Sequence, residues 1–92
     1  MSDAEEKQPA TIVLTFDPPI HFNGKDYTEV TLREPTSQQF ADAMDLGGVR
    51  SAIHLVHVVG KLPQAVAQLL PISKTLEADR FFSRFTVPGQ RT

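Results

Sequence analysis

The sequence predicts an α+β fold in which an N-terminal antiparallel β-hairpin is followed by a compact bundle of three to four short helices. Two observations support this fold class. Near Pro35 the spacing of apolar residues changes from every second residue, as in a strand with one buried face, to about 3.6 residues, as in a helix. Before that point, Asn23-Gly24 is the residue pair that most strongly favours a two-residue hairpin turn.

The composition indicates one small domain between two polar ends. Residues 1–10 are expected to form a disordered arm, residues 11–86 a single domain and residues 87–92 a flexible tail. The chain has no Cys, which excludes a disulfide framework and a Cys-ligated zinc site. Nine Lys and Arg stand against eleven Asp and Glu, so capture of nucleic acid by a cationic surface is not expected. No apolar run is long enough to span a membrane, so no membrane partner is expected.

The register of the hairpin follows from its turn and from two prolines. A two-residue turn at Asn23-Gly24 places Ile20 opposite Tyr27. Continued without interruption, this register would turn the apolar residues of the two strands to opposite faces. Pro18-Pro19 interrupts the first strand, and neither proline can donate a ladder hydrogen bond. We therefore predict a β-bulge with one extra residue there, which sets Phe16 opposite Val30 and Leu14 opposite Leu32.

After Pro35 the sequence predicts four helices, over about 36–46, 49–59, 63–70 and 74–85. The first begins with a capping box, in which Thr36 is the N-cap and Gln39 follows three residues later. Gly47-Gly48 provides its C-terminal stop, and Pro63 is suited to the first position of the third helix.

The last three helices carry apolar residues at helical spacing, which are expected to form the core. In the second helix they are Val49, Ala52, Ile53, Leu55, Val56 and Val59. In the third they are Val66, Leu69 and Leu70, and in the fourth Ala78, Phe81, Phe82 and Phe85. Leu76 points away from the Phe side of the fourth helix, so this helix either packs on two sides or exposes one.

The second helix also carries the first candidate partner-binding surface. Its basic side chains are expected to follow one line opposite the apolar stripe, and they are Arg50, His54, His57 and Lys61. Val58 lies within the same polar face and would add apolar area if it were exposed. Two interpretations fit this strip: a solvated polar face, which is the usual role of charged residues, and a docking strip for an acidic partner.

The fourth helix carries the second candidate surface. Three of the six Phe residues, Phe81, Phe82 and Phe85, lie close together near its end. Aromatic rings at helical spacing usually belong to the core, because each buries a large apolar area. The alternative is a partly exposed patch that binds a helix of a partner protein.

The chemistry-bearing residues form no catalytic or ligand-binding pattern. Nucleophilic catalysis needs an activated Ser, Thr or Cys beside a base, and no such motif is present, so an enzyme is not expected. His54 and His57 lie three apart without a third ligand at helical spacing, so no metal is expected. No glycine-rich phosphate loop is present, and no cofactor is expected.

Residues 49–70 also resemble a helix-turn-helix pair, which keeps open a second function as a small nucleic-acid-associated regulator. In that arrangement the second helix of the pair would enter a major groove and contact phosphates. Residues 63–70 contain no Lys or Arg, so DNA readout is not expected.

The order of these signals resembles a known protein family. Three segments carry the resemblance, followed by the Phe-rich end: Val30-Thr31-Leu32-Arg33-Glu34-Pro35-Thr36, Gly60-Lys61-Leu62-Pro63 and Leu76-Glu77-Ala78-Asp79. Over about residues 11–86 the chain is similar to the small tail assembly chaperones of contractile-tailed, Mu-like bacteriophages and prophages. The most specific segment is the strand exit and helix cap formed by Leu32, Arg33, Glu34, Pro35 and Thr36, for which we expect a structural role.

The resemblance implies a non-enzymatic role in the cytoplasm of the bacterial host. Members of this family bind the long, helical tape measure protein and keep it soluble while tail-tube subunits polymerise around it. They are not expected in the mature virion. Related chaperones are often made in a second, frameshifted and longer form that recruits the tail tube protein, so this protein is a second implied partner. The family has no catalytic residues to carry over.

Overall fold

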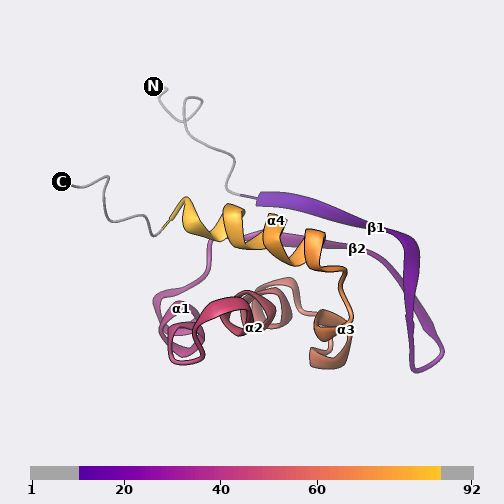
Figure 1. Cartoon of the computed structure of the whole chain (residues 1–92), viewed down its shortest axis with the longest axis horizontal. Coiled ribbons are helices and arrows are strands. Elements are labelled where there is room, and N and C mark those ends of the chain that lie inside the picture. Colours follow the sequence, from indigo (N-terminus) through magenta and orange to yellow (C-terminus); the bar gives the residue numbers. More distant parts are fainter. Residues whose placement is uncertain (1–10, 86–92) are drawn as a thin grey trace, which may run out of the picture.

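The computed structural model describes residues 11–85, and both the predicted arm at 1–10 and the predicted tail at 87–92 lie outside the described residues. Figure 1 shows a long hairpin with the helices gathered along it. The elements are β1 (Thr11–Phe22), β2 (Lys25–Arg33), α1 (Ser37–Met44), α2 (Gly48–Gly60), α3 (Gln64–Gln68) and α4 (Ile72–Ser83). The predicted α+β class, a hairpin followed by four short helices, is confirmed.

The hairpin pairs in the predicted register next to its turn but not beyond the two prolines. Ile20 lies opposite Tyr27, as expected for a two-residue turn. On the other side of Pro18-Pro19 the pairing resumes with Leu14 opposite Val30, where we predicted Phe16 opposite Val30. Between the two paired segments β1 has four residues, 16–19, and β2 has one. The irregularity is therefore where we predicted it, but it contains three extra residues instead of one.

The reason for this error is that alternation distinguishes odd from even shifts but not one extra residue from three. Either odd number returns Leu14, Val30 and Leu32 to the same face of the hairpin. All three are buried, which confirms the predicted apolar face. Phe16 lies within the irregular segment without a partner in the register, and it is buried as well.

The core lies between this apolar face and α2, which contacts β2 and each of the other helices. Its fully or almost fully buried members come from every element and include Leu14, Leu32, Ala43, Val56, Val59, Val66 and Phe81. The end of α2 comes closest to the sheet at Gly60. A Cβ atom on Gly60 would lie well inside the van der Waals distance of Val30 Cγ2, so only glycine allows this approach.

The predicted start of α1 is confirmed. The Thr36 hydroxyl accepts a hydrogen bond from the Gln39 N–H (3.1 Å), and the Thr36 N–H donates to Gln39 Oε1 (2.9 Å), which together form the capping box. Gly47 and Gly48 follow α1 with positive φ angles of 72° and 55°, which explains the glycine pair at this junction. Within residues 11–85, none of the helices is long and apolar enough to cross a membrane.

Two residues that we expected in the core are exposed instead. Val49 lies in the first turn of α2, where it lines a groove beside α4 and keeps about half of its surface exposed. Leu69 is exposed because α3 ends at Gln68, after only five residues, so the helical spacing does not continue through it. Val66 and Leu70 are buried as predicted.

Candidate functional site

The predicted basic strip is shorter than the sequence suggests. α2 ends at Gly60, and Lys61 takes a left-handed conformation with a φ of 59°. Lys61 therefore does not continue the helical line of Arg50, His54 and His57. Arg50 is exposed, whereas both histidines are half-buried, with ring centroids 6.3 Å apart in an edge-to-face arrangement.

His57 has a structural role at the end of α2. Its Nδ1–H donates to the carbonyl oxygen of Leu62 (2.6 Å), and the Leu62 N–H donates back to the carbonyl oxygen of His57 (3.2 Å). This reciprocal pair closes the turn between α2 and α3. Because it occupies Nδ1, only the Nε2 atom of the ring is left for a further hydrogen bond.

Val58 does not add an exposed apolar side chain to this strip. It is half-buried and packs against the hydrophobic core. The sequence interpretation placed Val58 within the polar face, and the packing of α2 against several elements at once explains why that face is narrower than a helical wheel indicates.

The Phe-rich end of α4 is divided between core and surface. Phe81 and Phe82 are buried, with 2% and 3% of their surface exposed, and their ring centroids lie 5.4 Å apart. Phe85 is half-buried, packs edge-to-face on Phe81, and lines a shallow hollow together with Pro35 and Phe40. Of the three rings proposed as a binding patch, Phe85 is thus the least buried.

The Leu32–Thr36 segment is a structural junction. Leu32 is fully buried, β2 ends at Arg33, and Thr36 caps α1. Arg33 and Glu34 are exposed, and Glu34 and Pro35 border the same hollow as Phe85. The most specific part of the resemblance therefore lies beside the end of α4 in space.

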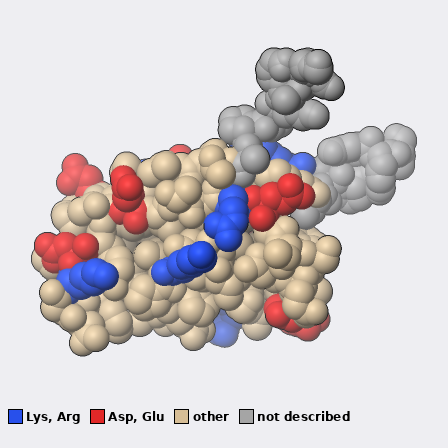
Figure 2. All heavy atoms as spheres, turned by 180° about the vertical axis from the view of Figure 1, so that it is seen from behind, with Lys and Arg blue, Asp and Glu red and all other residues tan. Residues whose placement is uncertain are grey.

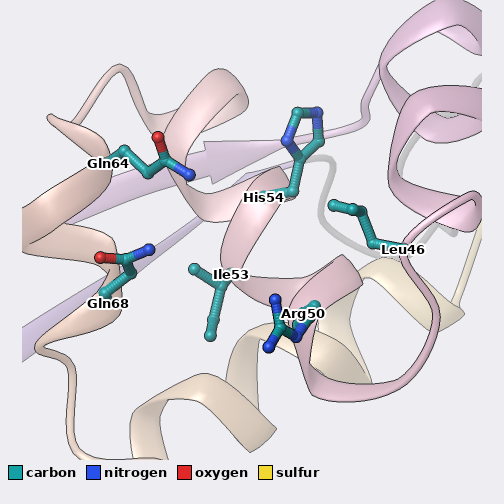
Figure 3. Close-up of a pocket in the computed structure, with 6 residues that line it drawn as sticks. All are labelled: Leu46, Arg50, Ile53, His54, Gln64 and Gln68. Atoms are coloured by element: carbon teal, nitrogen blue, oxygen red, sulfur yellow. The ribbon is translucent and has the colours of Figure 1, made fainter.

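A first hollow lies on the exposed side of α2, with a volume of about 310 Å³. Figure 3 shows Arg50 and His54 of α2 around it, with Ile53 between them and the two glutamines of α3. Leu46, which precedes α2, completes the lining and is about half exposed. This hollow combines apolar side chains with one full positive charge.

A second hollow of about 360 Å³, which was not predicted from the sequence, lies between α2 and α4. Val49 and Leu76 form its exposed apolar walls, and Asp79 lies at its edge. Its floor consists of the buried small residues Ser51, Ala52 and Thr75, and the exposed Gly48 also lines it. One signal was present, because Leu76 was expected to point away from the Phe side of its helix; it is indeed exposed.

Apolar side chains of both hollows, together with Ile72, form a surface that we name the apolar band: Leu46, Val49, Ile53, Ile72 and Leu76. Leu46 and Ile53 line the first hollow, and Val49 and Leu76 line the second. Val49 and Ile53 lie four residues apart on α2, as do Ile72 and Leu76 on α4, so each pair shares a helix face. All except Ile53 are exposed.

The charges of the described residues are mixed and mostly solvated. Figure 2 shows acidic and basic groups scattered over a largely uncharged face of the molecule. Among residues 11–85, ion pairs join His21 to Asp26 and Lys74 to Glu77 (3.6 Å between Nζ and Oε1), and Arg50 belongs to neither. In the same part of the chain, no three His, Asp or Glu side chains are grouped so that they could hold a metal ion.

The pair α2 and α3 lacks the features of a DNA-reading unit. α3 has five residues and carries glutamines but no cation on its surface. A recognition helix needs side chains that contact phosphates and base edges. This geometry gives no support to the nucleic-acid interpretation of residues 49–70.

Comparison with known protein families gives a match over most of the chain. A family model described as "Phage tail assembly chaperone proteins, E, or 41 or 14" matches residues 11–87. The matched segment contains every described element, from β1 to α4. No curated protein and no solved structure matches the chain.

Proposed function

The chain belongs to the phage tail assembly chaperone family, and we propose that it binds the tape measure protein and shields it from aggregation while the tail tube forms. The match over residues 11–87 is the observation that carries this proposal. It agrees with the resemblance found in the sequence alone. The proposed role is non-enzymatic and works by stoichiometric binding.

The physical reason for such a role lies in the partner. A tape measure protein is a long amphipathic helical chain, and its apolar stripe favours aggregation until another protein covers it. A small domain can cover one stretch of that stripe if it presents apolar side chains with a charged border. The apolar band beside Arg50 has this character.

The residues predicted from the sequence to bind a partner have different places in the proposal, because some lie at the surface and others in the turn or the core. Arg50 and His54 line the first hollow, and the half-buried ring of Phe85 lines a separate, shallow hollow. His57, Val58, Phe81 and Phe82 are engaged in the turn or in the core, so we propose that they support the binding surface from within. Lys61 is exposed at the end of α2 and would contribute only long-range attraction.

The test is co-expression of this chain with the tape measure protein encoded by the same phage genome. We expect the soluble yield of the tape measure protein to rise and the two proteins to purify together. The complex should tolerate added salt, because apolar contacts depend on salt far less than binding to nucleic acid does. A tape measure protein that is equally soluble without the chain, or that never purifies with it, would contradict the proposal.

Two further parts of the proposal concern location and partners. We propose that the protein acts in the cytoplasm of the bacterial host and leaves before the virion is complete. Mass spectrometry of purified particles should then detect the tail tube protein but not this chain.

If a longer, frameshifted form is made, we propose that its extension binds the tail tube protein. This longer product should appear in lysates of infected or induced cells.

A further inference from the structure

We propose that the apolar band on α2 and α4 is the docking surface for an amphipathic helix that carries an acidic side chain beside its apolar stripe. The identity of the partner, a helical segment of the tape measure protein, rests on the proposed function. The location of the surface and the chemistry of the helix rest on the contacts and charges described below.

The first reason is that the groove between α2 and α4 offers a partner a mainly apolar lining. Its floor is made of small residues, which let a side chain from outside enter. The two hydroxyl groups on the floor already donate within their own helices, Ser51 to the carbonyl of Gly48 (2.6 Å) and Thr75 to that of Pro71 (3.5 Å). An apolar side chain that fills the groove therefore leaves both hydroxyl donors with a partner.

The second reason is the extent of the band. Leu46 and Ile53 line the first hollow and Val49 and Leu76 line the second, while Ile72 lies one helical turn before Leu76 on α4. A surface that crosses two neighbouring helices accepts several side chains in a row. The stripe of an amphipathic helix supplies such a row at positions i, i+3, i+4 and i+7.

The third reason is the charge at the border of the band. Arg50 lines the first hollow, is exposed, and belongs to no ion pair among the described residues. An acidic side chain beside the partner's stripe would meet its guanidinium group as the apolar side chains enter the hollows. Asp79 at the edge of the second hollow favours a basic residue on the other flank of the stripe.

A second copy of this chain fits the surface less well than a separate helix. Both parts of the band are hollow, with volumes of about 310 and 360 Å³. Two concave surfaces placed face to face would leave unfilled space, which forfeits packing contacts. A protruding helix fills the hollows. Self-association through Arg50 and Asp79 is the competing arrangement, and the experiment below distinguishes it.

The experiment compares Val49→Asp and Leu76→Asp with a matched control, Val13→Asp, in co-expression with the tape measure protein. All three positions are exposed, at 47%, 43% and 53%, so each variant should keep the circular dichroism spectrum of the wild type. We expect both band variants to weaken binding by about ten-fold or more, and the control to bind like the wild type. Arg50→Glu should weaken binding, and Arg50→Lys should restore most of it.

A photo-crosslinking phenylalanine analogue at Leu76 identifies what covers the band. We expect its crosslink to map to a helical segment of the tape measure protein with an apolar stripe and an adjacent acidic residue. Crosslinks between two copies of this chain, or a dimer in sedimentation that Leu76→Asp converts to a monomer, would overturn the proposal. Folded band variants that bind as tightly as the wild type would overturn the location alone, whereas a wild type that never binds would overturn the proposed function and this inference with it.

Discussion

Replacement of Gly60 by alanine tests the packing of α2 on the hairpin, because no side chain fits where this helix meets β2. A Cβ atom at this position would collide with Val30 Cγ2 and lie 3.2 Å from Leu32 Cδ2. Val30 and Leu32 are buried, with 3% and 0% of their surface exposed, so neither can move away freely. Overpacking of this kind costs about 1–3 kcal/mol.

An opposing contribution has to be subtracted from this cost. Alanine is favoured over glycine inside a helix by about 1 kcal/mol, and by less at the last residue of α2. We therefore expect Gly60→Ala to lower the free energy of unfolding by about 1–2 kcal/mol. For a domain of this size, each kcal/mol lowers the melting temperature by about 4–8 °C.

A double-mutant cycle with Val30→Ala isolates the collision. Removal of both Cγ atoms of Val30 opens the space that the new methyl group needs, so Gly60→Ala should be neutral or slightly stabilising in that background. We expect a coupling free energy of about 1–3 kcal/mol, measured by urea unfolding followed by circular dichroism because the chain has no Trp. An equal cost of Gly60→Ala in both backgrounds would refute the reasoning.

Three further predictions concern α1, α2 and α4. Thr36→Ala removes one half of the capping box and should cost about 1 kcal/mol in urea unfolding, whereas Thr36→Ser should cost little. His57→Ala removes the hydrogen bond to the Leu62 carbonyl and should cost about 1 kcal/mol. His54→Ala should hardly change the melting temperature, because no such bond links His54 to another residue within 11–85. Equal effects of the two substitutions would rule out the turn-closing role. Phe82→Ala should cost about 3–5 kcal/mol because the ring is buried, and Phe85→Ala clearly less; if both lower the melting temperature equally, Phe85 is as much a part of the core as Phe82.

Local signals in the sequence predicted the elements well. The Asn23-Gly24 turn, the Thr36 cap and the change of period at Pro35 each depend on a few neighbouring residues, and the structure confirms all three. The size of the bulge at Pro18-Pro19 could not be predicted in this way. Alternation constrains only whether the number of extra residues is odd, so it does not distinguish one extra residue from three.

The candidate site was harder to predict because helical wheels show only one helix at a time. Val49 and Leu76 lie on different helices, and only the tertiary packing brings them to the same groove. The helical wheel also placed Lys61 on the line of Arg50, His54 and His57, although Lys61 lies beyond the helix in a left-handed conformation. For α4, the sequence was compatible with two interpretations of the Phe residues, a core position or a binding patch. In the structure Phe81 and Phe82 are buried in the core, whereas Phe85 is half-buried.

The position of the hairpin tip has a practical consequence for studies in living cells. Asn23 and Gly24 are exposed, and Figure 1 shows the tip at the far end of the hairpin from α1 and from the start of β1. A short epitope or a small fluorogenic tag inserted between them would lengthen a loop, which is among the changes that folded domains tolerate best. Such a tagged chain would test under the microscope the proposal that the protein acts on nascent tails and leaves before the virion is complete.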